Sequence, residues 1–324
     1  MNSCIKIARR GLLAVAAGAL VAFAAPVHAQ DDYPNKTIEV VIHSAFGGGT
    51  DITARTMIID TSKNLGVDMV VASHRGGSGA KAQSYVLSKP ADGYTIMALT
   101  QSHLYTMARG KSDMKIDDII GVARAMDDPT FVAVSANGPF KTMEDLVKVS
   151  KERPLNWGVA QIGGTEHIGL AQLSKAAGMQ YKVVPFGSGG QMVQALLSGA
   201  IDATVPNVSE AGGQIADGTI RALAVMAEER LDDYPDVRTT FEMNYPVKTS
   251  TTRGYAVRAD TPKEIVDKLS AAMVEGMNGP VFASYLKSSG LNPKTSVAGS
   301  EVWDKQLKEE YKTAVEAMKE LGLL

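Results

Sequence analysis

Cysteine is almost absent from this chain, and histidine is scarce. Of the 324 residues only Cys4 is a cysteine, and it lies in an N-terminal segment that we expect to be removed. The mature chain would then have no thiol, which excludes disulfides and metal sites built from cysteine. The five histidines are scattered, and none stands at the H-E-x-x-H spacing of zinc proteases. We therefore expect no metal and no cofactor.

Motifs for catalysis are also missing. The stretch Gly187-Ser188-Gly189 lacks the context of a nucleophile elbow, and no G-K-[ST] follows a glycine loop, as a Walker motif requires. The glycine loop over residues 76–79 lacks the full dinucleotide fingerprint. We therefore expect no catalytic residues and no enzyme. An exported hydrolase that uses His43 or His167 with a nearby serine remains an alternative at this point.

Neither sign of charge dominates the chain. The formal net charge is −2, with 21% charged and 45% hydrophobic residues, as in ordinary soluble globular proteins. A mildly acidic chain has no general attraction for nucleic acid or for an anionic membrane, so an anionic ligand would need a local site. Beyond the N-terminus no apolar run is long enough to span a bilayer. The length favours two domains.

The N-terminus has the pattern of an export signal. Lys6, Arg9 and Arg10 precede an Ala-, Leu- and Val-rich run over residues 11–25, and Val27-His28-Ala29 fits the small-x-small rule for cleavage. A membrane anchor is disfavoured because the apolar run is short and rich in alanine. We expect a signal peptide over residues 1–29, cleaved near Ala29.

Strand-like and helix-like segments alternate along the rest of the chain. Short apolar runs predict strands over 38–42, 69–72, 94–99, 131–134, 157–160, 182–185, 203–206 and 221–226. Helical patterns are predicted over 52–65, 80–88, 142–149, 165–177, 191–198, 209–217, 262–277 and 301–320. Thr142 with Asp145 three residues later is typical of a helix N-cap. The alternation predicts parallel α/β sheets covered by helices on both faces.

Glycine-rich connections stand where predicted strands lead into helices. The most informative is Ser44-Ala45-Phe46-Gly47-Gly48-Gly49-Thr50-Asp51, and three more lie over residues 76–79, 163–164 and 187–190. Such loops expose backbone N–H groups beside the partial positive charge of a helix N-terminus, which suits a carboxylate. In α/β sheets ligands sit beyond the carboxyl ends of strands, so these loops predict a ligand cleft.

An ordered series of motifs resembles the solute receptors of the tripartite tricarboxylate transporter family, also called Bug receptors. The resemblance covers essentially the whole mature chain. Its motifs include Gly47-Gly48-Gly49-Thr50-Asp51, Arg75 with Gly77-Ser78-Gly79, Pro90-Ala91-Asp92-Gly93-Tyr94-Thr95, Gly164-Thr165-Glu166-His167, Val184-Pro185-Phe186-Gly187-Ser188-Gly189, Leu197-Ser198-Gly199-Ala200-Ile201-Asp202-Ala203, Gly218-Thr219-Ile220-Arg221-Ala222-Leu223-Ala224-Val225 and Thr261-Pro262-Lys263-Glu264-Ile265-Val266.

The resemblance implies a periplasmic receptor with a two-domain α/β fold. We expect the Venus-flytrap, type II-like fold of periplasmic binding proteins, with two mixed or parallel sheets and a hinge. Domain I would be residues 31–128 plus 253–324, domain II residues 129–252, and the last helix would pack on domain I. The resemblance further implies that a monomer binds a small organic acid, a carboxylate or dicarboxylate, by ligand-gated closure. It would then deliver the acid to integral membrane transporter subunits.

The family pattern also implies which residues contact the ligand. Gly48, Gly49 and Thr50 would offer backbone donors to a carboxylate, with Asp51 bracing their loop, and several neutral donors together can hold a carboxylate. The other residues that the resemblance implies at the site are Phe46, Thr100, Gln101, Ser102, Gly164, Thr165, His167, Phe186, Gly187, Ser188, Asn207 and Ser209.

Some alternatives stay open at the level of sequence. His43 on a strand is more often a core histidine than a ligand contact, and His103 could add a donor near the mouth of the cleft. The partner could be a sensor kinase rather than a transporter. The sequence does not name the acid, and C4 dicarboxylates, tricarboxylates and aromatic acids all fit.

Overall fold

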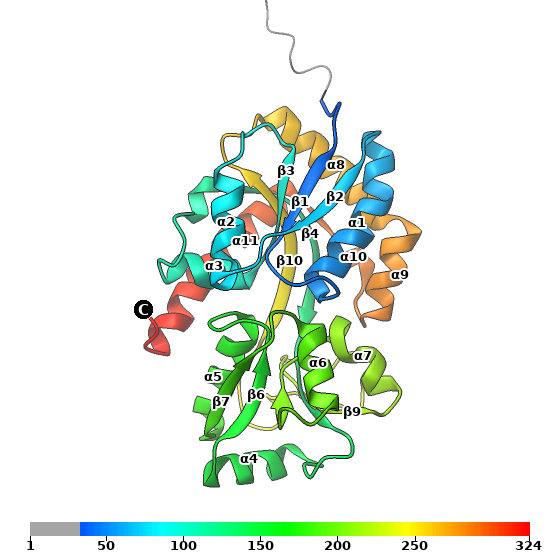
Figure 1. The fold of residues 1–324 in the computed structure, drawn as a ribbon. Helices are drawn as coiled ribbons and strands as arrows, with labels where there is room; N and C mark the ends of the chain where they lie inside the picture. The colour runs from blue at the N-terminus through cyan, green and yellow to red at the C-terminus, as the bar shows by residue number, and fades with distance from the viewer. Residues whose placement is uncertain (1–32) are drawn as a thin grey trace, which may run out of the picture. The chain divides into compact units, whose positions relative to one another are not determined.

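The computed structural model describes residues 33–324. The expected signal peptide over residues 1–29, its cleavage near Ala29, and Cys4 lie outside the described residues. Residues 34–324 form one unit, and within it the chain folds around two separate β-sheets. In Figure 1 one sheet and its helices lie in the upper part of this unit, which we call the first lobe. The other sheet and its helices make up the second lobe below it.

The first lobe has a six-stranded mixed sheet in the order β11-β4-β10-β3-β1-β2. Its strands are β1 (Ile38–Ile42), β2 (Met69–Ser73), β3 (Thr95–Thr100), β4 (Ile119–Pro129), β10 (Ser250–Arg258) and β11 (Ala298–Gly299). Strand β1 is parallel to β2 and β3, but β10 is antiparallel to both β3 and β4. The sheet is therefore mixed rather than purely parallel, because the chain returns to it from the second lobe in the opposite direction.

Helices cover this sheet on both sides. They are α1 (Gly49–Leu65), α2 (Ala80–Leu87), α3 (Gln101–Ala108), α8 (Lys263–Asn278), α9 (Pro280–Ser288), α10 (Pro293–Ser296) and α11 (Ser300–Glu320), with the short 3₁₀ turns η1 (Gly77–Gly79) and η2 (Ile116–Asp118). Helix α11 packs against β4 and α3, and its Trp303 Nε1 donates a 3.1 Å hydrogen bond to the Tyr255 carbonyl of β10. The last helix thus packs on the first lobe, as expected.

The second lobe has a five-stranded mixed sheet in the order β7-β6-β8-β5-β9. Its strands are β5 (Phe131–Ser135), β6 (Leu155–Val159), β7 (Tyr181–Pro185), β8 (Ala203–Thr204) and β9 (Ile220–Val225), and its helices are α4 (Met143–Glu152), α5 (Thr165–Ala177), α6 (Gly189–Leu197) and α7 (Val208–Ala216). Strand β6 is parallel to β7 and β8, and β5 is antiparallel to β8 and β9.

Two long paired strands connect the lobes. Strand β4 ends in the first sheet at Pro129, β5 begins in the second sheet at Phe131, and the chain re-enters the first sheet with β10 at Ser250. The pairing of β4 with β10 extends from Ser250 opposite Pro129 to Arg258 opposite Ile119, and Figure 1 shows both strands running down to the second lobe. The domain boundaries given above, at 128/129 and 252/253, remain predictions.

The capping box expected at the start of α4 is present. The Asp145 backbone N–H donates to Thr142 Oγ1 at 3.1 Å, and the Thr142 N–H donates back to Asp145 Oδ2 at 3.0 Å. Two N–H groups that the helix itself cannot satisfy are thereby paired. Helix α1 begins at Gly49, three residues before the predicted start at Ile52. The prediction was late because it relied on the spacing of apolar residues, which polar residues in the first turn do not show.

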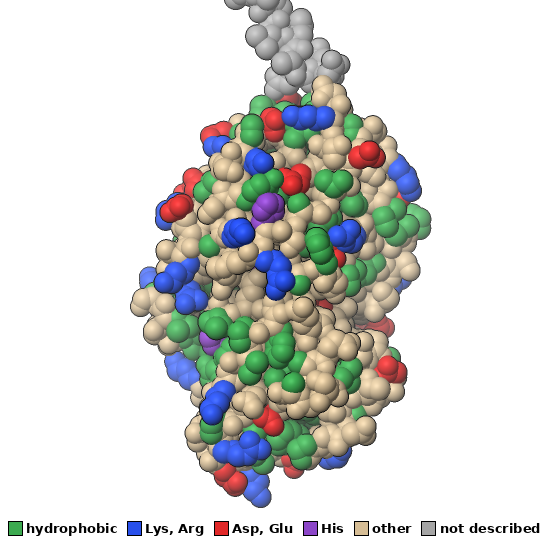
Figure 2. Space-filling model, in the orientation of Figure 1, with side chains coloured by type: hydrophobic (Ala, Val, Ile, Leu, Met, Phe, Trp, Pro, Cys, Tyr) green, Lys and Arg blue, Asp and Glu red, His purple; other side chains and the backbone are tan. Residues whose placement is uncertain are grey.

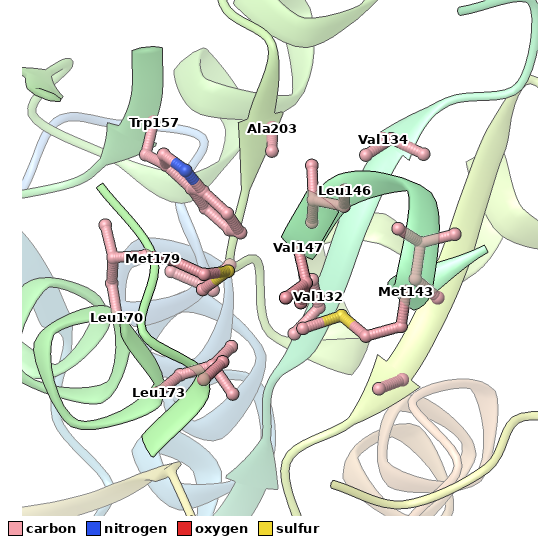
Figure 3. Close-up of a cluster of buried hydrophobic side chains, with 14 of the residues drawn as sticks. Val132, Val134, Met143, Leu146, Val147, Trp157, Leu170, Leu173, Met179 and Ala203 are labelled. Carbon is pink, nitrogen blue, oxygen red and sulfur yellow. The ribbon is translucent and has the colours of Figure 1, made fainter. Parts of the chain in front are cut away.

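Each lobe has its own apolar core. In the second lobe Trp157, Leu146 and Leu173 are fully buried between the sheet and helices α4 and α5, and Figure 3 shows these side chains facing one another with Val132, Met143 and Met179. Burial of each such side chain contributes about 1.5–3 kcal/mol. The first lobe is built in the same way around Leu99, Leu104, Trp303 and Leu307. Each lobe can therefore remain folded while the other moves.

The surface carries both signs of charge. Figure 2 shows Lys and Arg side chains and Asp and Glu side chains spread over the same face of the molecule, in line with the formal net charge of −2. Among the helices of residues 33–324, none combines the length and the apolar content needed to cross a membrane.

Candidate ligand cavity between the lobes

Five helices of the described chain begin at one small cavity between the lobes. It is lined by His43, Ser44, Gly48, Gly49, Thr50, Thr100, Ser102, Ala160, Gln161, Glu166, Ser188, Gly189, Glu210, Thr251 and Arg253. These residues include the first turns of α1 and α3 from the first lobe and of α5, α6 and α7 from the second. Each N-terminus adds partial positive charge, so the arrangement favours an anionic group.

The cavity is small because the lobes are in direct contact around it. Its volume is about 30 Å³, which is room for about two water molecules. The Ala45 N–H of the first lobe donates to the Gly187 carbonyl of the second at 3.1 Å. Ser102 Oγ accepts from the Thr165 N–H at 3.2 Å. An organic acid therefore enters only when the lobes move apart.

The loop before α1 forms one wall. Gly48 caps the helix with an extended backbone, and Gly49 and Thr50 follow it into the first turn. Asp51 Oδ2 accepts a 2.9 Å hydrogen bond from the Gly47 N–H, and Asp51 Oδ1 accepts from Arg55 Nε at 2.8 Å. Asp51 thus braces the loop, as its position suggested, and its carboxylate is already occupied by these two donors.

The start of α3 forms a second part of this wall; Thr100 and Ser102 were predicted here as site residues, but the helix was not predicted. Thr100 and His103 make a capping box, in which His103 Nδ1 accepts from the Thr100 N–H at 3.1 Å. His103 is fully buried, and burial together with neighbouring His43 holds its pKa well below the usual range. The suggestion that His103 donates near the mouth of the cleft is therefore wrong.

Arg253 lies at the centre of the polar groups and was not among the predicted site residues. It extends from β10, is 4% exposed, and donates to the Asp128 carboxylate in the first lobe. Arg253 Nη2 also donates to Asn207 Oδ1 of the second lobe at 3.1 Å and lies 3.7 Å from Glu210 Oε1. A Cβ on Gly49 would overlap this guanidinium, so glycine is needed there for the close approach.

The second lobe adds two buried carboxyl groups. Glu210 on α7 accepts from the Gly49 N–H at 3.1 Å and from the Asn207 N–H at 3.2 Å, so it links the starts of α1 and α7. Burial raises the pKa of Glu210. Burial also raises the pKa of Glu166, with a further increase from the charge of Glu210, to about 7. The two carboxyl groups therefore repel each other inside the cavity.

The remaining charges of the cavity follow from the same physical effects. Burial opposes the charge of Arg253, but the carboxylates of Asp128 and Glu210 outweigh it and raise the Arg253 pKa above its ordinary value. Burial, with Arg253 nearby, lowers the pKa of His43 to about 4. His43 is therefore neutral at pH 7, and Arg253 is the cation of the lining.

Several buried polar atoms of the lining have no hydrogen-bond partner within residues 33–324. They are His43 Nδ1, Ser44 Oγ, Gln161 Oε1, Glu166 Oε2, Thr251 Oγ1 and Arg253 Nε. Buried polar groups are normally paired, so a concentration of unpaired ones at one place points to a bound molecule. No group of three or more His, Cys, Asp or Glu in the described chain could hold a metal ion.

The structure brings some predicted site residues to the cavity and leaves others outside. Gly48, Gly49, Thr50, Thr100, Ser102 and Ser188 line it. Gly164 and Thr165 lie just behind, where Thr165 contacts Ser102. Asn207 holds Arg253, and Ser209 donates to Asp128, so these two support the lining without being part of it.

The other predicted residues face elsewhere. The Phe46 side chain is 59% exposed. Gln101 bonds Thr252 and Glu310 on the opposite side of β10, and His167 Nδ1 accepts from the Gly163 N–H at 2.8 Å. Phe186 packs on the second-lobe core, and the carbonyl of Gly187 accepts from Ala45.

The comparison with known families assigns the chain. A model described as the tripartite tricarboxylate transporter family receptor, TctC, matches residues 53–323. The chain belongs to this family. TctC receptors are binding proteins and not enzymes.

Related proteins share the length and the fold of this receptor. It is similar to Protein BugT of Bordetella pertussis, with 26% identity over 303 residues, 90% of each chain. It is also similar to MatC from Rhodopseudomonas palustris, solved with bound malate, with 25% identity, a TM-score of 0.82 and coverage of 88% and 99%. A structure described as a periplasmic transporter has 28% identity, a TM-score of 0.83 and coverage of 89% and 97%. The fold is that of two-domain periplasmic binding proteins with two mixed sheets.

Proposed function

We propose that this TctC receptor binds a small organic acid in the cavity between its lobes, in the periplasm, and delivers it to a membrane transporter of the tripartite tricarboxylate type. The observation that carries the proposal is the convergence of five helix N-termini on one cavity, several buried polar atoms of which have no partner within residues 33–324. MatC, a similar protein, was solved with malate, which supports a carboxylate as the ligand.

The N-terminal turns supply the donors for the carboxylate. We propose that Gly48, Gly49 and Thr50 bind it from the first lobe and Ser188 from the second, with Thr100 and Ser102 beside them. Hydrogen bonds to a charged group are each worth about 1.5–3 kcal/mol, so several neutral donors can hold an anion. Contacts from both lobes mean that the acid stabilises the closed arrangement by its differential affinity for it.

Lobe closure would then signal that the receptor is loaded. The boundaries of the moving parts would lie near residues 128/129 and 252/253, in the paired strands β4 and β10, and the closed receptor would be the form that the membrane subunits recognise. The receptor would release the acid chemically unchanged, because receptors of the TctC family are binding proteins and not enzymes.

A thermal-shift screen against organic acids tests this function. A ligand that binds only the folded receptor increases the free energy of unfolding by about RT ln(1 + [L]/Kd), and so it raises the melting temperature. The panel should contain dicarboxylates of four to six carbons, tricarboxylates, aromatic acids and amino acids, and the same compounds as methyl esters as controls. We expect at least one free acid to raise the melting temperature while its ester does not. A panel in which no acid has an effect would contradict the proposal.

A further inference from the structure

We propose that the acid bound by this receptor carries a protonated amino group, and that this group lies between Glu166 and Glu210. The inference rests on the proposed function, because it assumes that the helix N-termini bind the carboxylate of the same ligand. The ligand class is then a zwitterionic acid, such as an α-amino acid, rather than a plain dicarboxylate of the same length.

Two carboxyl groups of the second lobe lie at the cavity. Glu166 from α5 and Glu210 from α7 both line the cavity. Glu166 is 6% exposed, and the side chain of Glu210 is 7% exposed. Glu166 Oε2 accepts no hydrogen bond within the described chain. A buried carboxylate oxygen without a donor in the lining of a binding cavity needs a donor from the ligand.

The balance of charge around the cavity also favours an ammonium group. Arg253 is the cation among the lining residues, and its guanidinium already donates to Asp128. His43 is neutral because burial lowers its pKa to about 4. Glu166 and Glu210 therefore share one arginine with Asp128. A plain dianion would add two more negative charges here, whereas an ammonium group would neutralise one.

The cavity also has more than one acceptor without a donor in the described chain. Besides Glu166 Oε2, the Gln161 Oε1 atom lines the cavity and has no partner in residues 33–324. An ammonium group has three donors and no acceptor. A hydroxyl group at the same place offers one donor and no charge, so it leaves one of these acceptors unpaired and leaves the repulsion between the carboxyl groups in place.

The charge of Glu166 determines whether ligand binding releases or takes up a proton, which can be measured. The groups that face it are Glu210 on α7, Arg253 on β10, Tyr105 on α3 and His43 at the end of β1. Burial raises the Glu166 pKa to about 7, so at pH 7 Glu166 is partly protonated in the free receptor. An ammonium group nearby lowers that pKa and releases a proton, whereas a dianion raises it and takes a proton up.

The test compares matched acids by calorimetry at pH 7. The pairs are succinate with aspartate, glutarate with glutamate, and adipate with 2-aminoadipate, each titrated in two buffers of different ionisation enthalpy. We expect the amino member of at least one pair to bind about tenfold more tightly or better. Its binding should release a proton, and its affinity should rise between pH 6 and pH 8. The proton linkage is measured on the wild-type receptor and needs no variant.

Two variants locate the effect. Glu166→Gln and Glu210→Gln keep the side-chain shape, and glutamine at position 210 can still complete the capping box of α7. Each should weaken binding of the amino member about tenfold more than it weakens binding of the plain member. The matched control Glu264→Gln, in the exposed first turn of α8, should change neither affinity.

The outcomes separate this inference from the function on which it rests. If the plain acid of every pair binds more tightly and takes up a proton, the ammonium site is wrong and the acid receptor stands. The same holds if both Gln variants bind the amino acid as the wild type does. If no acid of either kind binds or changes the melting temperature, the proposed function fails and the ammonium site fails with it.

Discussion

Arg253 Nη2 of the first lobe donates a 3.1 Å hydrogen bond to Asn207 Oδ1 of the second. Asn207 is the N-cap residue of α7, so the guanidinium is tied directly to a helix start in the opposite lobe. Glu210 makes the reciprocal link, from α7 to the Gly49 N–H of α1. The closed arrangement is therefore held by polar groups of the cavity itself. A ligand that enters must replace at least part of these bonds.

A methyl group at Gly48 should hinder closure without unfolding either lobe. A Cβ at this position would lie 2.8 Å from Ser188 Cβ in the opposite lobe, and the extended backbone of Gly48 accepts any residue. We expect Gly48→Ala to make the free energy of lobe closure less favourable by about 1–3 kcal/mol, which weakens acid binding about tenfold or more. Small-angle scattering with saturating acid should show a larger radius of gyration than for the wild type.

Gly213→Ala is the matched control for Gly48→Ala. It adds the same methyl group on α7, where nothing lies within 4 Å, and should leave affinity and radius of gyration unchanged. A Gly48→Ala receptor that binds acid with wild-type affinity would show that the lobes need not approach as closely as this structure indicates.

The hydroxyl groups of Thr50 and Ser188 should contribute to acid binding from opposite walls. Both side chains line the cavity, and hydrogen bonds to a charged ligand are worth about 1.5–3 kcal/mol each. We expect the double variant Thr50→Ala, Ser188→Ala to weaken binding at least about tenfold in calorimetry. Circular dichroism should show that the fold is retained.

Loss of a helix cap needs its own control, because Ser188 Oγ also accepts from the Gln191 N–H at 3.4 Å. Thr142→Ala removes the N-cap of α4 outside the cavity and should cost a comparable ~1 kcal/mol of stability. Its acid affinity should equal that of the wild type. Equal affinities for the double variant and the wild type would remove these two residues from the proposed site.

Glu310 should make the free receptor less stable as pH rises. Burial raises its pKa from 4.5 to about 7, although hydrogen bonds from Gln306 and Thr252 act in the opposite direction. Between these two pH values the unfolded chain loses the proton and the folded chain keeps it. The contribution of Glu310 to stability is therefore greatest below pH 4.5, falls as pH rises towards 7, and is constant above.

The variant Glu310→Gln isolates this titration from that of His43, whose lowered pKa has the opposite effect on stability below pH 6.5. Urea unfolding at pH 5 and pH 8 should show the wild type losing about 1–3 kcal/mol relative to the variant, after allowance for partial solvent access. Glu309→Gln, at the exposed neighbouring residue, should follow the wild type. A stability difference that does not change with pH would contradict the assignment.

Local patterns predicted the loops of the cavity because those loops are defined by neighbours in sequence. At Gly48, Gly164 and Ser188 a strand, a glycine turn and a helix N-terminus follow one another within a few residues. At each place the spacing of the apolar residues changes from that of a strand to that of a helix. The capping box of Thr142 is local in the same way. The start of α3 was missed because His103 takes the place that Glu or Gln usually has in a capping box.

The charged groups of the cavity could not be predicted because their partners are far away in sequence. Arg253, Asp128 and Glu210 come from three elements and meet only after both lobes have formed. A signal was present: Arg253 stands in β10, whose central residues are all buried, and an arginine in such a strand needs a partner. Strand β10 itself was not predicted, and its antiparallel direction depends on the return of the chain from the second lobe.

The contact between the end of α11 and α5 has a practical use. Helix α11 packs on the first lobe, yet Lys175 Nζ of α5 in the second lobe donates to the carbonyl of Glu320 at 3.2 Å. A fluorophore attached beyond Glu320 would move with the first lobe and would lie next to the second lobe in the closed arrangement. Paired with a second dye on the exposed face of α5, it would convert lobe separation into a change in energy transfer, and so make the receptor a sensor for its own ligand.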